Sequence, residues 1–158
     1  MKVFSRTHEI CIKELFRKIR EHYGNNLLSL VVFGSYARGS NRYNSDIDLL
    51  IILKDAPRIS ERIRDFIVNV EEPLEELEKK LTEEGIYMDI SPLILTSEEA
   101  LNFSPLYLDI LENHIIICDR GFFRKLVEFI GEEAKKRKVL RYKVDGHDVW
   151  EFGGVSVG

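Results

Sequence analysis

Two aspartates separated by a single residue, Asp46 and Asp48, stand between a loop rich in small and polar residues and the apolar run 49–53. On a strand, residues two apart leave the same face of the sheet, so the two carboxylates would lie side by side and repel each other. A cation between them would remove that repulsion, and oxygen-only ligands favour magnesium, with manganese as the alternative. The pair therefore predicts a metal site, although an isolated Asp-x-Asp is more often a solvated strand end.

A third carboxylate, Asp89, is flanked by the apolar residues Met88 and Ile90 in a stretch that is typical of a strand. A buried, unpaired carboxylate is costly, so Asp89 requires either a cation or a hydrogen-bond partner. If its strand lies beside the strand of the aspartate pair, three carboxylates converge and can hold two metal ions at about 3.5–4 Å. The alternative is a carboxylate that simply binds an arginine or a backbone N–H group.

Gly34 and Ser35 follow an apolar stretch directly. A strand that ends in Gly-Ser before a short helix presents backbone N–H groups to an anion, and glycine allows close approach to the backbone. The Ser35 hydroxyl adds a hydrogen-bonding group, and two arginines in the same loop, Arg38 and Arg42, are candidate phosphate clamps. An ordinary turn with surface arginines is the alternative. A phosphate-binding turn beside a metal-binding carboxylate pair is typical of enzymes that transfer a group from a nucleoside triphosphate.

The elements that must position these residues follow from periodicity and from turn residues. Apolar residues at helical or strand spacing, interrupted at Gly24, Pro73 and Gly85, give the order α, β, β, α, β, α, β, α. We expect an α/β (α+β) domain in which a small mixed sheet packs against helices. The expected helices are 7–23, 57–85 with a break at Pro73, two short ones from 97 and 104, and 121–138; the expected strands are 27–33, 46–53, 86–95 and 114–118.

Composition limits the class of protein. The 158 residues suit one compact domain, and 44% hydrophobic with 32% charged residues provides a core and a charged surface. A net charge of −4 argues against general nucleic-acid coating, and leaves only local contacts open. Neither a secretory signal nor a bilayer-spanning run is present, so we expect a cytoplasmic protein without membrane contact. The four histidines share no metal-ligand spacing, so each is expected on the surface or in the core.

The run Phe33 to Gly39, followed by Ser45-Asp46-Ile47-Asp48-Leu49-Leu50, resembles the signature of the DNA polymerase β-like nucleotidyltransferase superfamily. The flanks are similar to those of its minimal nucleotidyltransferase family in archaea and bacteria. The resemblance implies the polymerase β-like fold for a nucleotidyltransferase domain of residues 1–138. It implies that Asp46 and Asp48 bind the metal ions, that Asp89 is the third carboxylate and helps to deprotonate an acceptor hydroxyl, and that Gly34 and Ser35 hold the β- and γ-phosphates.

The same resemblance implies an activity and a partner. Some members transfer AMP from ATP to a tyrosine of a HEPN-type toxin and so act as its antitoxin, with two magnesium ions. A non-catalytic antitoxin that occludes its partner is the alternative, as is nucleotidylation of a small molecule or an RNA end with ATP or another NTP. The tail 139–158 is expected to form a hairpin or a partner-binding arm. A homodimer is a further possibility.

Overall fold

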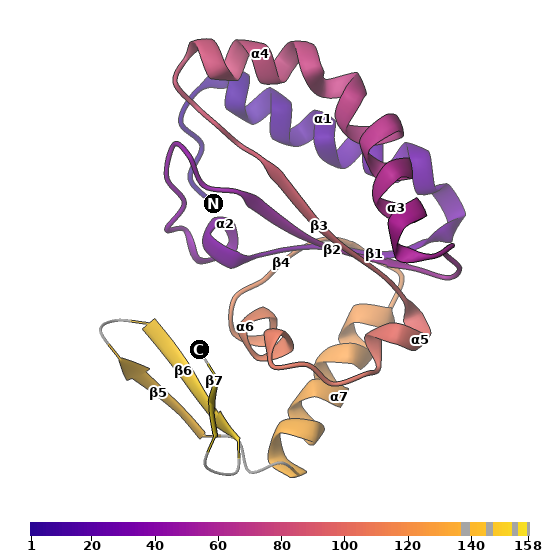
Figure 1. Cartoon of the computed structure of the whole chain (residues 1–158), viewed down its shortest axis with the longest axis vertical. Coiled ribbons are helices and arrows are strands. Elements are labelled where there is room, and N and C mark those ends of the chain that lie inside the picture. Colours follow the sequence, from indigo (N-terminus) through magenta and orange to yellow (C-terminus); the bar gives the residue numbers. More distant parts are fainter. Residues whose placement is uncertain (137–139, 145–146, 153–154, 158) are drawn as a thin grey trace.

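A four-stranded sheet lies at the centre of the fold, with strand order β3-β2-β1-β4 (Figure 1). Its strands are β1 (Leu27–Phe33), β2 (Ile47–Leu53), β3 (Ile90–Thr96) and β4 (Ile115–Asp119). β1 pairs antiparallel with both β2 and β4, whereas β2 and β3 run parallel. β1 and β2 are almost wholly buried, as expected for apolar strands that are covered on both faces. This mixed sheet with its helices confirms the predicted fold class.

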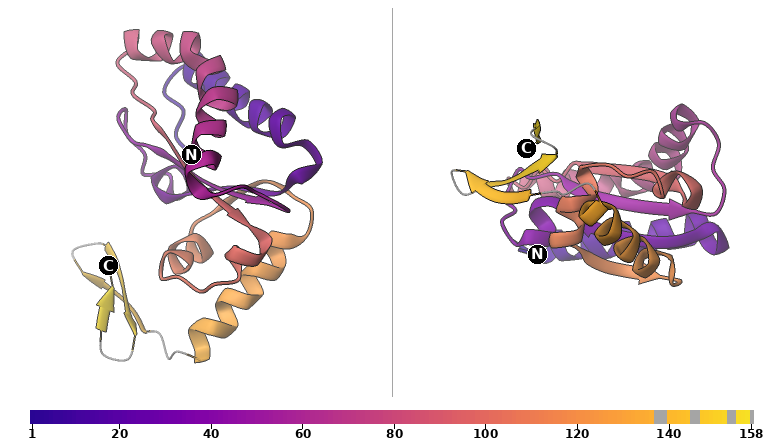
Figure 2. Two further views of the ribbon diagram at one scale, coloured as in Figure 1. Left: turned by 45° about the vertical axis from the view of Figure 1, so that its right-hand side comes forward. Right: turned by 90° about the horizontal axis from the view of Figure 1, so that it is seen from below.

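The computed structural model describes residues 1–136, and the backbone of 140–144, 147–152 and 155–157. Helices cover both faces of the sheet (Figure 1 and Figure 2). One face carries α1 (Arg6–Tyr23), α3 (Ile59–Phe66), the π-helical turn η2 (Ile67–Glu71), the 3₁₀ turn η3 (Glu72–Leu74) and α4 (Glu75–Glu83). The other face carries α5 (Ser97–Ala100), α6 (Leu106–Glu112) and α7 (Phe122–Lys136). The remaining short elements are η1 (Gly24–Asn26) and α2 (Gly34–Arg38).

Strand alternation divides the apolar residues into two cores. Along β2, Leu49 and Ile51 pack with α1, η2 and α4, while Leu50 and Ile52 pack with α6 and α7. Residues of one strand thus serve both layers because successive side chains leave opposite faces. Asp48 is two residues before Leu50, so its side chain leaves the same face of the sheet and lies on the side that α6 covers.

The helix boundaries agree with the sequence signals. Ser5 caps α1 by accepting a hydrogen bond from the His8 backbone N–H at 3.1 Å, and Gly24 ends the helix at a φ of 51°. Pro73 interrupts the long helical region, which continues as α4 after the 3₁₀ turn η3. Among the described helices, none has both the length and the apolarity to cross a bilayer.

The third strand differs from the prediction. β3 begins at Ile90, and residues 86–89 run beside the loop before β2 without regular strand structure. Two backbone hydrogen bonds join them to the segment that leads into β2, from Tyr87 N to Tyr43 O at 2.7 Å and from Ile47 N to Asp89 O at 2.8 Å. Asp46 likewise lies just before its strand, which starts at Ile47. Both acidic side chains are therefore exposed at strand entrances, not enclosed within strands.

The backbone after α7 forms a second, three-stranded antiparallel sheet, with order β5-β6-β7. Its strands are β5 (Leu140–Val144), β6 (His147–Phe152) and β7 (Val155–Val157). The predicted boundary between the main domain and the tail, at residues 138 and 139, lies outside the described residues. The role of the tail 139–158 in binding a partner remains a prediction.

Candidate active site

Asp48 lies in the middle of the sheet at the entrance of β2. In register it stands between Phe33 of β1 and Ser91 of β3, and its side chain is half-buried. Burial raises the pKa of the Asp48 carboxyl above its ordinary range, and the nearby charge of Asp46 raises it further. A hydrogen bond from the Ser91 hydroxyl acts in the opposite direction. The structure thus brings the two aspartates together as a repelling pair, in which one partner is partly desolvated.

Gly34 borders this pair directly. It adopts a φ of +69°, and a Cβ atom at this position would overlap the Asp48 carboxylate, with the Asp48 Cγ only 3.1 Å away. The absence of a side chain is therefore what allows the carboxylate of β2 to lie against the end of β1. α2 begins at Gly34, and its N-cap residue Phe33 provides no side-chain hydrogen bond to the first turn. Ser35 follows in that turn, partly exposed.

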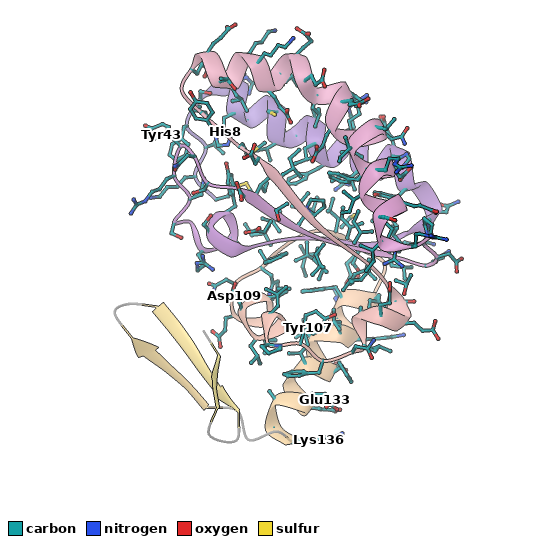
Figure 3. The ribbon with its side chains drawn as sticks, in the orientation of Figure 1. His8, Tyr43, Tyr107, Asp109, Glu133 and Lys136 are labelled. Carbon is teal, nitrogen blue, oxygen red and sulfur yellow. The ribbon has the colours of Figure 1, made fainter. Side chains whose placement is uncertain are left out.

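Arg38 lies beside the aspartate pair but is held by another residue. Its Nη1 forms an ion pair with Asp109 Oδ2 of α6 at 3.3 Å, and both side chains are partly exposed. Asp109 lies on α6, on the side of the sheet that Asp48 faces (Figure 3). The Arg38 charge lowers the pKa of Asp48, whereas the Asp109 charge raises it. A basic and an acidic residue that are far apart in sequence thus meet at the mouth of the site.

Arg42 is exposed in the loop between α2 and β2, and no described contact brings its guanidinium to the aspartate pair. Its backbone N–H donates to the Ser45 hydroxyl at 2.8 Å, and the Ser45 N–H donates back to the Arg42 carbonyl at 3.2 Å. Ser45 thus closes the turn into β2.

Asp89 departs from its predicted surroundings. It is exposed, so the expected cost of burying a lone carboxylate does not arise. Asp89 and Ser91 are both exposed and are two residues apart, and Ser91 pairs with Asp48. By this alternation Asp89 would lie on the same face as Asp48. On the opposite helix layer, however, burial raises the pKa of Glu71 and Glu78, and the Asp89 charge adds to that effect.

No three His, Cys, Asp or Glu side chains converge in a metal-holding arrangement within the described part of the chain. The predicted three-carboxylate cluster is therefore not assembled in this structure. Asp46 and Asp48 nevertheless fit a hard divalent cation, because they supply oxygen donors only and repel each other without one. The carbonyl of Asp89 accepts a hydrogen bond from Ile47 N at the start of β2. The Asp89 side chain would have to turn toward Asp46 and Asp48 to join them at a metal ion.

Two residues of the site were missed by the sequence reasoning. Ser91 has the same strand parity as Asp89, so a closer look at the alternation could have found it. Asp109 gives no signal in the sequence, because it resembles any acidic residue on the exposed side of an amphipathic helix. Only the packing of α6 against the sheet brings it to Arg38.

Comparisons with known proteins agree with this geometry. The family model described as "Nucleotidyltransferase domain" matches residues 12–152. A curated relative from Methanocaldococcus jannaschii, "Putative protein adenylyltransferase MJ1305", is 31% identical over 151 residues, which cover 89% of this chain and 91% of the relative. A second relative from the same organism, "Putative protein adenylyltransferase MJ0141", is 39% identical over 51 residues, covering 32% of this chain and 52% of the relative.

Among solved structures, a spectinomycin adenyltransferase from Enterococcus faecialis, crystallised with ATP and spectinomycin, matches with a TM-score of 0.57. The match covers 81% of this chain and 66% of the other, at 15% sequence identity. At that identity the likeness establishes the fold alone. The fold, the family model and the long relative all concern the region that contains Gly34, Asp46 and Asp48.

Proposed function

The chain belongs to the nucleotidyltransferase domain family, and from that premise we propose that it transfers the adenylyl group of ATP to a hydroxyl of a protein acceptor. The observation that carries the proposal is the repelling pair of Asp46 and Asp48 beside the bare backbone of Gly34. Two neighbouring carboxylates, one of them partly buried, are costly to keep together unless a cation occupies the site.

The residues divide into two functions in this proposal. Asp46 and Asp48 would hold magnesium, which supplies positive charge that neutralises the triphosphate and stabilises the departing pyrophosphate. Gly34 lets the Asp48 carboxylate lie against the start of α2, and the backbone of that first turn, with the Ser35 hydroxyl, would bind a phosphate beside the metal. Arg38 would leave Asp109 to bind a phosphate, because a partly exposed ion pair at 3.3 Å costs little to exchange.

The group transfer is balanced as follows. The acceptor oxygen forms a bond to the α-phosphorus of ATP, and the bond from that phosphorus to the bridging oxygen of the β-phosphate breaks. Pyrophosphate leaves with the bonding electron pair, and the proton of the acceptor hydroxyl passes to a carboxylate. We assign that carboxylate to Asp89, which lies beside the entrance of β2 and is exposed enough to meet an acceptor.

The acceptor that we propose is a tyrosine of a HEPN-type toxin, so that the chain acts as the antitoxin. The motif from Phe33 to Gly39 supports this assignment by its resemblance to the minimal nucleotidyltransferases. A long relative that is named as a protein adenylyltransferase supports a protein acceptor over a small molecule. Two magnesium ions and the choice of ATP over other nucleotides belong to the same proposal.

The test is to incubate the purified chain with ATP, magnesium and the protein encoded by the neighbouring gene, and then to weigh both proteins by intact mass spectrometry. An AMP adduct on the partner that disappears with the double variant D46A/D48A supports the proposal. A tight but unmodified complex would instead indicate a non-catalytic antitoxin. Pyrophosphate release with neither protein modified would indicate a small-molecule or RNA acceptor.

A further inference from the structure

A histidine lies in the core next to the site without any part in the proposed chemistry. His8, in the first turn of α1, has no exposed surface. Its Nε2 lies 3.0 Å from the hydroxyl of Tyr36, and its Nδ1 lies 3.1 Å from the backbone nitrogen of Phe4. Both ring nitrogens are therefore within hydrogen-bonding distance of a partner. A buried ring nitrogen that lost its partner would destabilise the fold, so both contacts must be kept.

The partners determine the tautomer of His8. A backbone N–H can only donate, so Nδ1 accepts from Phe4 and the proton must reside on Nε2. Nε2–H then donates to the Tyr36 hydroxyl. Neutral histidine with this tautomer satisfies both bonds, whereas protonated histidine would point a second N–H group at the Phe4 N–H. The arrangement thus accepts one protonation state only.

The network continues to the loop that leads to the aspartate pair. The Tyr36 hydroxyl shares a hydrogen bond with the side chain of Asn41, and both side chains are buried. Asn41 is also tied to the backbone of Lys2 twice, from Lys2 N to Asn41 Oδ1 and from Asn41 Nδ2 to Lys2 O, each at 2.9 Å. The N-terminal segment therefore crosses over α2 and is joined to it at His8 and to the following loop at Asn41.

Aromatic packing reinforces the same crossing. Phe4 stacks on His8, with ring centroids 5.6 Å apart, and also on Tyr43 of the loop, at 4.4 Å. His8 and Tyr43 accordingly lie close together at the N-terminal end of α1 in Figure 3. We call the segment 1–8 with these contacts the N-terminal strap.

The strap contacts the parts of the chain to which we assign phosphate and metal binding. Tyr36 stands between Ser35 and Arg38 on α2, a short helix that is held on its buried side by the contact with His8 and on its exposed side by the ion pair of Arg38 with Asp109. Asn41 and Tyr43 belong to the loop that ends at Asp46. A movement of the strap would therefore move the phosphate-binding turn and the entrance of β2 together.

We propose that His8 is a positioning residue: its neutral ring, acting through Tyr36, holds α2 in the orientation that binds the nucleotide phosphates. The proposal rests on the proposed function, because it assigns phosphate binding to α2. Glu84 is the charged residue that acts on the His8 ring, and its carboxylate accepts hydrogen bonds from the hydroxyls of Ser5 and Thr7 at the start of α1. Burial raises the pKa of the Tyr36 hydroxyl, and the Cys11 thiol and the Asp46 carboxylate raise it further.

A dependence on pH follows from the geometry. Burial lowers the pKa of His8 from its ordinary value, and Glu84 partly opposes that effect. His8 is thus neutral at neutral pH, and it becomes protonated only as the pH falls through this lowered pKa. Protonation would break the bond from Phe4 and release the strap, so nucleotide binding should weaken on the acid side.

Two substitutions separate the two ring nitrogens. In H8Q the amide nitrogen occupies the place of Nε2 and can still donate to Tyr36, but it does not titrate. In H8N the amide oxygen occupies the place of Nδ1 and can still accept from Phe4, but the bond to Tyr36 is lost. H22Q is a matched control, since His22 lies on the same helix but pairs with Asp65 at 2.6 Å, away from α2.

The experiment measures magnesium–ATP affinity by titration calorimetry at a series of pH values from about 7.5 to well below the ordinary histidine pKa of about 6.5, because the pKa of His8 is lowered. We expect H8N to bind about tenfold more weakly than wild type, and H8Q and H22Q to bind within about threefold. Wild type should weaken at the lower pH by a larger factor than H8Q does. Circular dichroism of each variant establishes that it is folded.

Folded H8N with wild-type affinity, or H8Q and wild type with the same response to pH, would overturn the inference. If the wild type binds no nucleotide, the proposed function fails instead, and backbone hydrogen exchange then tests the strap alone. In that experiment residues 34–41 should exchange faster in H8N than in H8Q. Equal exchange in the two variants would also overturn the inference.

Discussion

Replacing Gly34 by alanine should disable the site by displacing Asp48. An alanine at a φ of +69° carries a backbone cost of about 1–2 kcal/mol. The new Cβ would also overlap the Asp48 carboxylate and would lie 3.1 Å from its Cγ, so the carboxylate must rotate away. Rotation breaks the hydrogen bond from Ser91, which adds about 1 kcal/mol. We expect a total loss of about 2–3 kcal/mol in the free energy of unfolding.

Gly39 provides the matched control. It has a φ of +75°, and nothing lies within 4 Å of a Cβ built on it. G39A should therefore lower the free energy of unfolding by the backbone cost of about 1–2 kcal/mol, without any contact between the new Cβ and the aspartate pair. The difference between the two variants isolates the displacement of Asp48. Because a misplacement of about 1 Å in a reacting group can cost about a hundredfold in rate, G34A should lose activity by that factor relative to G39A.

Urea unfolding gives the stability change, and magnesium-dependent pyrophosphate release from ATP gives the rate. Both variants should remain folded, since a loss of about 3 kcal/mol still leaves a typical domain stable. If G34A turned over ATP within about threefold of G39A, the contact between Gly34 and Asp48 would not matter for catalysis, which would contradict the role assigned to Asp48.

Two further predictions concern the surroundings of the site. D109N should lower the KM for ATP by a few-fold in steady-state kinetics, because Arg38 is then free to bind phosphate; an unchanged or raised KM would contradict this. E99Q should lower the free energy of unfolding by about 1 kcal/mol at neutral pH, because the buried Arg62 loses a charged partner. Arg62 holds the pKa of Glu99 at about 2, below its unfolded value of 4.5. This stabilisation is therefore present above 4.5 and is lost as the pH falls toward 2, so urea curves of wild type and E99Q should converge in acid.

The central strands and the turn between them could be predicted from sequence because their signals are local. The run from Leu27 to Phe33 is apolar enough to require cover on both faces, and Gly34 marks the point where the backbone must turn. The order of helices and strands followed from periodicity. The parallel register that sets Asp48 beside Ser91 did not, because pairing between distant strands leaves no mark on either strand alone.

The remaining features of the site depend on tertiary contacts. Asp109 reaches Arg38 only through the packing of α6, and His8 reaches Tyr36 only because the N-terminal strap crosses α2. Sequence reasoning assigned the histidines to the surface or the core, which is correct for His8 but misses its two partners. Asp89 was expected inside a strand, yet it lies at the exposed entrance, since β3 starts one residue later.

The measurement that tests the account most directly is the rate of magnesium-dependent adenylyl transfer by D48N. Asparagine keeps the shape of Asp48 and can still bond the Ser91 hydroxyl, but it removes the charge that we assign to metal binding. D55N is a suitable control, because Asp55 follows the far end of β2. We expect D48N to lose about a hundredfold to a thousandfold in rate and D55N to keep the wild-type rate. Equal rates in D48N and D55N would contradict the assignment of the site.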